Sequence, residues 1–299
     1  MRLTATGATL GTVSASVPGS TIVSVAGGSD DRTFVLDEQP WVDQQANPGA
    51  QQPFEPRTFY LLRLRADGQP ASVNRLPITE PSGAGVTGFA LSSDDTLLAV
   101  AVQPNNVKDE PELTELKLYS LATGAVVRSW DADGGIGLAL DNPEALSWTS
   151  DQRTLAFVWL GGPGSDPPQG EWLLDLGLGG TSLLGDSREV MSTSPNRMPL
   201  ACGEDLIITP DGSAVVCGAT NNSETAFYEF STATGKLART LAQWAVTGSV
   251  DVLWSNPSGS VLIGVASLNG NAEVGMVTDG RFTALPGLGP EDGSDRGAW

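Results

Sequence analysis

Short apolar runs separated by polar turns follow one another along almost the whole chain. In residues 144–159, two runs of β-branched, aliphatic and aromatic residues flank the polar turn 149–153. This pattern predicts a buried β-hairpin. Repetition of one such supersecondary unit predicts a repeat architecture. Variants of the unit recur around the polar turns at residues 29–32, 93–96, 210–213 and 257–260.

A second kind of turn, which ends in glycine, alternates with the first kind. Tight hairpin turns favour glycine because they require a positive φ. The runs around the glycine turns carry more charge than the runs around the polar turns, which suits outer and inner strands respectively. Each unit is therefore predicted to contain two hairpins, or four antiparallel strands. The glycine turns are Ala5-Thr-Gly7, Ala66-Asp-Gly68, Ala122-Thr-Gly124, Leu178-Gly-Gly180, Ala233-Thr-Gly235 and Thr278-Asp-Gly280.

A four-stranded unit that repeats every 45 to 64 residues is typical of a β-propeller blade. The first glycine turn has no polar-turn hairpin before it, so we assign it to a blade that the C-terminus completes, which would remove exposed sheet edges. We predict one all-β domain, a six-bladed β-propeller with four antiparallel strands per blade, closed by N- and C-terminal strands. Seven blades are the alternative, if residues 161–200 contain a degenerate blade. The predicted segments are outer strands of the closing blade in 1–16, blades in 17–80, 86–133, 142–187, 203–243 and 248–286, and a closing strand in 287–299.

Three of the hairpins, Ala90–Val100, Leu146–Phe157 and Ile208–Val215, resemble the WD-repeat-like blades of TolB-like propellers. Over about its full length the chain is also similar to the extracytoplasmic propeller of actinobacterial membrane-anchored proteins of unknown function. That resemblance implies an extracytoplasmic domain, anchored to the membrane in the full-length protein. The Trp-Asp pair that names WD repeats occurs only at Trp130-Asp131, and the family's structural histidine is absent. The resemblance is therefore specific for architecture rather than for function.

The composition narrows the chemistry that the chain can perform. With 16 Lys+Arg against 35 Asp+Glu, the net charge of -19 disfavours nucleic acid as a partner. The absence of histidine excludes Ser-His-Asp triads and histidine general bases. We therefore predict no catalytic activity and no cofactor. The alternative is a calcium-dependent propeller hydrolase or lyase with carboxylates in the central channel, although Asp131-Ala-Asp133-Gly134 is only a fragment of a calcium loop.

The connections between the two hairpins of a blade are long in residues 37–57, 103–114 and 161–170. In a propeller all such connections emerge on one face, and long connections are more often functional than idle. We therefore predict a non-catalytic binding or sensing module whose ligand, a protein, peptide or carbohydrate, binds on this face.

The first long connection carries Trp41 and Phe54 among the amides Gln44 and Asn47. Exposed aromatic residues beside amides are typical of sugar and peptide recognition. Trp159, at the end of an inner strand, is a further candidate for ligand binding, although inner-strand tryptophans are expected to pack between blades. The alternative for Trp41 and Phe54 is that they fold back over the rim of their own blade.

Cys202 and Cys217 flank the hairpin that turns at Asp211-Gly212, and counting outward from the turn places them within a few residues of facing each other. Either a disulfide, which would indicate an oxidising compartment, or two buried thiols fits this spacing. The sequence contains no apolar run near 20 residues and no signal peptide at Met1. We expect a monomer that contacts the membrane only through a segment upstream of Met1, which is then not the natural start.

Overall fold

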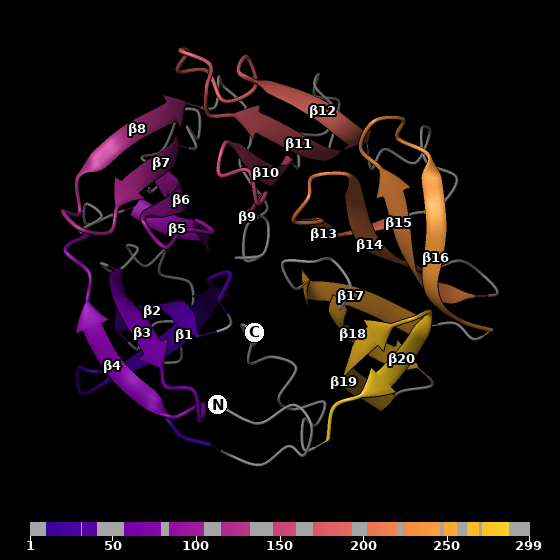
Figure 1. Cartoon of the computed structure of the whole chain (residues 1–299), viewed down its shortest axis with the longest axis horizontal. Helices are drawn as coiled ribbons and strands as arrows, with labels where there is room; N and C mark the ends of the chain where they lie inside the picture. The colour runs from indigo at the N-terminus through magenta and orange to yellow at the C-terminus, as the bar shows by residue number, and fades with distance from the viewer. Residues whose placement is uncertain are drawn as a thin grey trace, which may run out of the picture.

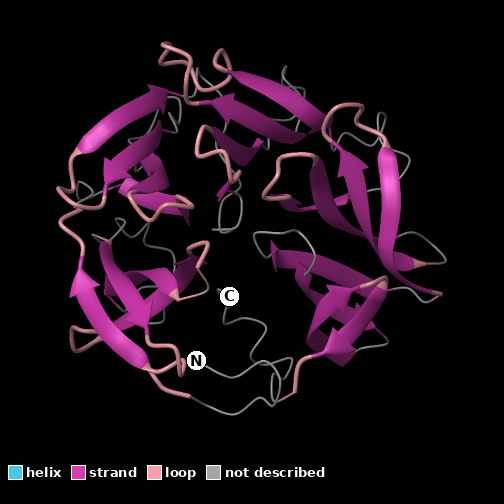
Figure 2. Cartoon of the chain, in the orientation of Figure 1, coloured by secondary structure: helices cyan, strands magenta, loops and turns pink. Residues whose placement is uncertain are grey.

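A computed structural model of the chain describes residues 10–30, 32–40, 57–78, 84–104, 115–131, 146–159, 170–192, 202–220, 224–245, 248–255, 262–268 and 271–286. In some strand segments, among them 202–205, 251–255 and 262–268, it describes the backbone alone. The regular secondary structure of these residues consists of strands, with turns and loops between them (Figure 2). The predicted all-β class is therefore confirmed for the described part of the chain.

The strands form five four-stranded antiparallel sheets, each hydrogen-bonded in chain order. Blade 1 comprises β1 (Ser20–Gly27), β2 (Thr33–Pro40), β3 (Thr58–Leu64) and β4 (Pro70–Arg75). Blade 2 comprises β5 (Ala84–Leu91), β6 (Leu97–Pro104), β7 (Glu115–Ser120) and β8 (Val126–Asp131). Blade 3 comprises β9 (Leu146–Trp148), β10 (Thr154–Trp159), β11 (Gly170–Asp175) and β12 (Ser187–Ser192). Blade 4 comprises β13 (Cys202–Ile208), β14 (Ala214–Thr220), β15 (Thr225–Ser231) and β16 (Leu237–Trp244). Blade 5 comprises β17 (Gly248–Ser255), β18 (Leu262–Leu268), β19 (Asn271–Thr278) and β20 (Arg281–Ala284).

The five blades are arranged around a centre, with the first strand of each blade innermost and the fourth at the rim (Figure 1). Burial follows this order, as the sequence predicts. In β6 every residue from Leu98 to Val102 is buried, because both faces of the strand pack against neighbouring blades. In the outer strand β8, by contrast, Val126 and Val127 are about half exposed, at 49% and 54%.

The hydrophobic core lies between neighbouring blades rather than at one centre. Phe59 of blade 1 meets Phe89 of blade 2 edge to face, with ring centroids 5.5 Å apart. Trp130 and Trp159 belong to the cluster between blades 2 and 3. Phe227 of blade 4 stacks on Phe282 of blade 5. Each blade is therefore stabilised mainly by the blades beside it.

The polar turns that the structure describes are each built on an aspartate whose carboxylate accepts a backbone N–H two residues further on. The residue after the aspartate is left-handed in three of them, with φ of 56° at Asp95 and Gln152 and 71° at Gly212. These four polar turns therefore share one local hydrogen-bond pattern. The hydrogen bonds run from Arg32 to Asp30 (2.9 Å), from Thr96 to Asp94 (3.1 Å), from Arg153 to Asp151 (2.8 Å) and from Ser213 to Asp211 (3.0 Å).

The glycine turns are confirmed at Gly68, Gly124, Gly235 and Gly280, which all have positive φ. At Gly180 the prediction of a tight turn is wrong. Residues 176–186, here called the cross-blade segment, join β11 to β12 and reach the outer strand of blade 2 instead. There Asp131 N–H donates to the carbonyl of Thr181 at 2.8 Å, and Leu183 N–H donates to the carbonyl of Asp131 at 2.9 Å.

Arg128 of β8 fixes the cross-blade segment from the side. Its guanidinium donates to the carbonyls of Leu176, Leu178 and Gly180 and lies 4.4 Å from the ring centroid of Trp130. The Trp130 indole N–H donates to Asp186 at 3.1 Å. The segment therefore covers Trp130, which is 1% exposed although it lies in a rim strand.

The predicted closing blade falls mostly outside the described residues, because residues 1–9 and 287–299 are not among them. Residues 10–15 are described and are not part of a β-strand. They follow the face of blade 1 that is turned away from blade 2, where Val13 packs against the cluster of Phe34, Leu36, Tyr60 and Leu62. Six blades, and closure of the ring by both termini, therefore stay a prediction.

Candidate functional site

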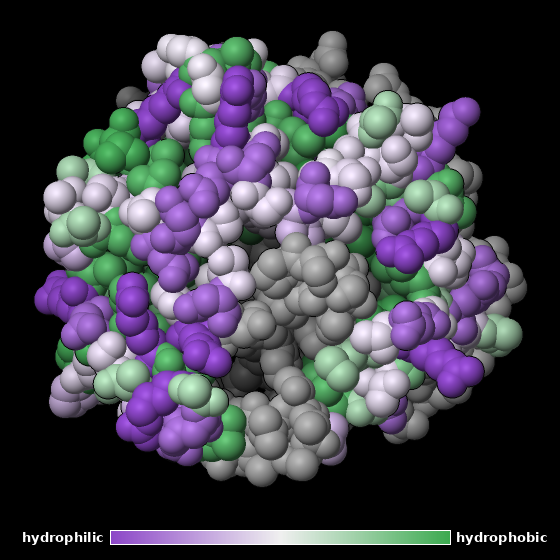
Figure 3. All heavy atoms as spheres, in the orientation of Figure 1, coloured by the Kyte–Doolittle hydropathy of each residue, from purple (hydrophilic) through white to green (hydrophobic). Residues whose placement is uncertain are grey.

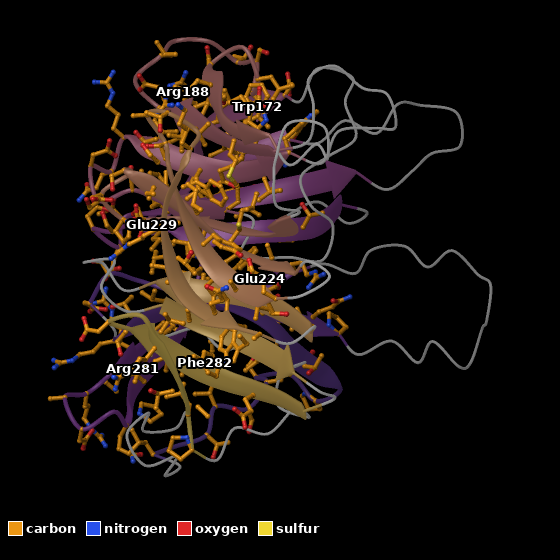
Figure 4. The ribbon with its side chains drawn as sticks, turned by 90° about the vertical axis from the view of Figure 1, so that its right-hand side faces the viewer. Trp172, Arg188, Glu224, Glu229, Arg281 and Phe282 are labelled. Atoms are coloured by element: carbon orange, nitrogen blue, oxygen red, sulfur yellow. The ribbon has the colours of Figure 1, made fainter. Side chains whose placement is uncertain are left out.

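The antiparallel order of the strands gives the molecule two different faces. The turn face carries the aspartate turns and the glycine turns, which join the first strand to the second and the third to the fourth. The connection face carries the strand ends at which the second strand is joined to the third. In the side view of Figure 4, Arg188 and Arg281, which follow turns, lie toward the left-hand side, whereas Trp172 and Glu224, at the starts of third strands, lie nearer the right.

The connections at the connection face differ in length from blade to blade. Those of blades 1, 2 and 3 comprise residues 41–57, 105–114 and 160–169, whereas those of blades 4 and 5 comprise only 221–224 and 269–270. Because strands of one blade are adjacent, a connection of two to five residues is enough to join them. The additional length is therefore concentrated over three consecutive blades.

The candidate residues Trp41, Gln44, Asn47 and Phe54 belong to the first of these connections and lie outside the described residues. Their role in ligand binding stays a prediction. The predicted start of the connection at Asp37 is wrong, because β2 continues to Pro40. Asp37 is therefore a strand residue at the root of the connection.

At this root, Asp37 forms a buried ion pair with Arg57. Asp37 is 2% exposed, and an N–H of the Arg57 guanidinium donates to its Oδ2 at 2.8 Å. Burial raises the pKa of Asp37 to about 6, and the Arg57 guanidinium, which lowers it, offsets only part of that effect. The other oxygen, Oδ1, is buried without a hydrogen-bond partner in the structure. Ser24, directly opposite Asp37 in the β1–β2 register, has a buried and likewise unpartnered Oγ.

The neighbouring residue Glu38 points to the other face of blade 1 and anchors the segment that precedes β1. Its carboxylate accepts the backbone N–H groups of Ser16, at 2.8 Å, and Val17, at 3.1 Å. The Ser16 hydroxyl contacts both Glu38 and the hydroxyl of Tyr60. Burial raises the pKa of Glu38, but these hydrogen bonds outweigh it and hold the pKa below its ordinary value.

Trp159, the remaining candidate from the sequence, is the last residue of β10 and is 1% exposed. It packs in the core between blades 2 and 3, as expected for an inner-strand tryptophan. Its indole N–H and that of Trp172, on the adjacent strand, are buried without a hydrogen-bond partner in the structure. A role of Trp159 in ligand binding stays a prediction.

Sequence reasoning did not find the buried carboxyl group of Glu171. This residue of β11 is 1% exposed and lies opposite Val158 and Met191 in the sheet. Burial raises the pKa of Glu171 well above its ordinary value. The only signal in the sequence was a single charge inside the otherwise apolar run Gly170–Leu174.

On the turn face a pocket of about 440 Å³ lies between blades 3 and 4. Its lining includes the carboxylates of Asp151, Asp175, Asp186 and Asp211. Each of them is engaged: Asp151 and Asp211 cap their own turns, Asp175 pairs with Arg153 at 2.9 Å, and Asp186 accepts from Trp130. Figure 3 views this face and shows polar and apolar residues interspersed over the described blades.

Within the described residues, no group of three or more His, Cys, Asp or Glu side chains is placed to hold a metal ion. That part of the chain also contains no helix with the length and hydropathy needed to cross a membrane. Cys217 of β14 is fully buried and disulfide-bonded. Cys202, the chain's other cysteine, begins β13, where its backbone pairs with Ala219; its side chain lies outside the described residues, so the Cys202–Cys217 pairing stays a prediction.

No protein-family model matches the chain, and no curated protein sequence matches it. The fold is similar to that of TolB from Acinetobacter baumannii, with a TM-score of 0.52 and 13% identity over 87% of this chain and 53% of that one. A protein assigned as TolB in Agrobacterium tumefaciens gives a TM-score of 0.54 and 12% identity over 88% of this chain and 80% of that one. A protein assigned as a dipeptidyl aminopeptidase IV in Bacteroides ovatus gives 0.51 and 13%, over 91% of this chain and 42% of that one.

This chain thus spans about half the length of the A. baumannii TolB and less than half of the B. ovatus protein. At 12–13% identity the likeness concerns the fold, and blades of four antiparallel strands in chain order carry it. The actinobacterial similarity expected from the sequence is not among these findings. The chain has the fold of the TolB-like β-propellers.

Proposed function

We propose that this protein is a non-catalytic binding module whose polypeptide partner binds on the connection face, over blades 1 to 3. The observation that carries the proposal is the uneven length of the connections there, which are long in these three blades and short in blades 4 and 5. Binding residues are found preferentially on loops that a rigid scaffold positions. The ring of stacked blades provides such a scaffold.

The turn face is less suited to this role because its polar groups stabilise the fold. The Ser29 hydroxyl donates to the carbonyl of Ser93 in the next blade at 2.6 Å, and Ser150 N–H donates to the carbonyl of Pro210 at 2.6 Å. These bonds join the inner turns of neighbouring blades. Substitutions that adapted this face to bind a partner would therefore also disturb the packing between neighbouring blades.

We place the module outside the cytoplasm, anchored to the membrane. The disulfide bond of Cys217 supports an oxidising compartment, since structural disulfides persist mainly there. The net charge of -19 supports a partner that is not a nucleic acid and favours monomers, because like-charged copies repel each other.

Photo-crosslinking residues placed on both faces of the same blade test the proposal. Pro40 and Glu115 lie at the connection face of blades 1 and 2, and Asp67 and Thr123 lie on exposed turns of the same blades. In the native host, we expect a protease-sensitive cross-linked adduct from positions 40 and 115 and none from positions 67 and 123. An adduct from the turn positions alone would overturn the proposal. An adduct that a glycosidase removes, and a protease does not, would replace the polypeptide by a carbohydrate.

A further inference from the structure

We propose that Asp37 and Arg57 form a proton-controlled clasp at the root of the first long connection. Ionised Asp37 holds Arg57, and protonated Asp37 releases it. The connection belongs to the face on which we propose that the partner binds. We therefore further infer that partner binding there depends on pH, and this second inference rests on the proposed function.

The geometry of the clasp comes from the sheet register. The ladder between β2 and β3 pairs Asp37 with Phe59 and ends at the pair Glu38–Thr58. Arg57 lies one residue beyond that last pair, where the connection enters β3. Its bond to Asp37, at 2.8 Å, therefore joins the last residue of the connection to a strand residue inside the ladder.

The surroundings of Asp37 make the pair sensitive to protonation. On its own sheet, Asp37 faces the hydroxyl of Ser24 from β1 and the ring of Phe59 from β3. The apolar cluster between blades 1 and 2 covers the same face, with Phe89 among its members. Among the described residues, Arg57 is the charged group that acts on Asp37. Desolvation thus opposes the ionised carboxylate, and a single guanidinium, whose side chain is 14% exposed, favours it.

Protonation changes the hydrogen bonds that Asp37 can make. An ionised carboxylate only accepts, whereas a protonated carboxyl group has one O–H that donates. The proton comes from solvent, and Oδ1 is the oxygen with no partner in the structure. The unpartnered Ser24 hydroxyl on the facing strand can accept that O–H after a local side-chain adjustment. The protonated state therefore gains a partner within the blade, while Arg57 loses its counter-ion.

The two states exchange in a narrow pH range without unfolding the protein. Burial raises the pKa of Asp37 from 3.8 to about 6, so the group is mostly ionised at pH 7 and mostly protonated at pH 5. For an acid whose pKa is raised by folding, the ionised form destabilises the fold, fully above pH 6 and not at all below pH 3.8. Acidification from pH 7 to pH 5 therefore opens the clasp and, through this group, stabilises the folded state.

Hydrogen exchange at residues 57–59, corrected for the intrinsic effect of pH, tests the clasp without any partner. We expect protection in the unmodified protein to fall about tenfold between pH 7 and pH 5, corresponding to one pKa unit of differential interaction. Asp37→Asn, which cannot ionise, should show the low protection at both pH values. Asp67→Asn, which removes an exposed carboxylate of a turn in the same blade, should retain the pH step.

Direct titration of Asp37 by carboxyl ¹³C NMR in the unmodified protein keeps the inference testable if Asp37→Asn does not fold. A titration midpoint below 4.5, or a pH step that persists in Asp37→Asn, would overturn the clasp. If the yield of the adduct at position 40 is the same at pH 7 and pH 5, the inference that partner binding depends on pH is overturned. The clasp itself is not affected by that result. Failure to cross-link from either connection-face position at any pH would instead count against the proposed function.

Discussion

Gly218 in β14 shows how closely neighbouring blades approach each other. A Cβ added at this position would overlap the carbonyl group of Val250, which belongs to β17 of the next blade. The φ of Gly218 is not positive, so a side chain would be excluded by space rather than by backbone conformation. Gly218 thus sets the distance between blades 4 and 5.

We therefore expect Gly218→Ala to destabilise the protein by about 1–3 kcal/mol, the usual range for inserting an extra methyl group into a tightly packed site. Urea unfolding at pH 7 measures the change. Gly179→Ala is the matched control, because nothing lies within 4 Å of a Cβ added there. Equal stability of the two variants would show that blades 4 and 5 can move apart at little cost.

Single residues also mark the limit of what the sequence predicts. The turn aspartates could be recognised because their role is local: the hydrogen bond from Ser213 is the main cause that lowers the pKa of Asp211 below its ordinary value. Asp37 and Glu171 could not, because their burial depends on which blade packs over them. A charged residue in a strand is expected at an exposed position, and only the stacking of blades reverses that expectation.

At the scale of elements, the cross-blade segment connects two blades through the side chain of Arg128. Its guanidinium serves three carbonyls of the segment and lies 3.7 Å from Asp186. Arg128→Met keeps the packing over Trp130 but removes these donors. We expect faster hydrogen exchange in residues 176–186 and a loss of about 1.5–3 kcal/mol in stability, as for hydrogen bonds to a charged group.

Arg239→Met is the control for that prediction. Arg239 also pairs with a carboxylate, Glu229 at 2.7 Å, but its side chain is 61% exposed. Exposed ion pairs contribute about 0–1 kcal/mol, so this variant should unfold nearly like the unmodified protein. If the two variants lost the same stability, the carbonyl contacts of Arg128 would not be what holds the segment.

The sequence correctly predicted the glycine turns in which glycine is required by a positive φ. At Leu178-Gly-Gly180 glycine is present for a different reason. The carboxylate of Asp186 occupies the position that a Cβ of Gly180 would take, so glycine there allows a side chain to approach. Composition alone does not distinguish a glycine required by φ from a glycine required by space.

At the scale of the whole molecule, the repeat of two alternating turn types was enough to predict blades of four antiparallel strands. Local patterns sufficed because each blade repeats one sequence of short-range pairings. The candidate site depends instead on the connections between hairpins, which have no periodic pattern. Trp41 and Phe54 lie outside the described residues, and what the structure adds is the root that holds their connection, Asp37 and Arg57.

The behaviour of the whole protein toward calcium separates the proposed module from the alternative hydrolase or lyase. The turn aspartates nearest the ring centre are engaged with their own backbones, so we expect calcium and chelator to leave the midpoint of thermal unfolding unchanged. A bound ion would raise it by mass action. A decrease of several degrees on chelation, with calcium present in the purified protein, would favour the alternative.

The cross-blade segment also limits how such a protein can change by recombination. Propellers gain and lose blades when a unit is duplicated or exchanged at the joints between them. A copy of blade 3 inserted elsewhere would carry residues 176–186 next to a rim strand without Arg128 and Trp130. Blades 2 and 3 are therefore expected to be inherited, transplanted or deleted as a pair.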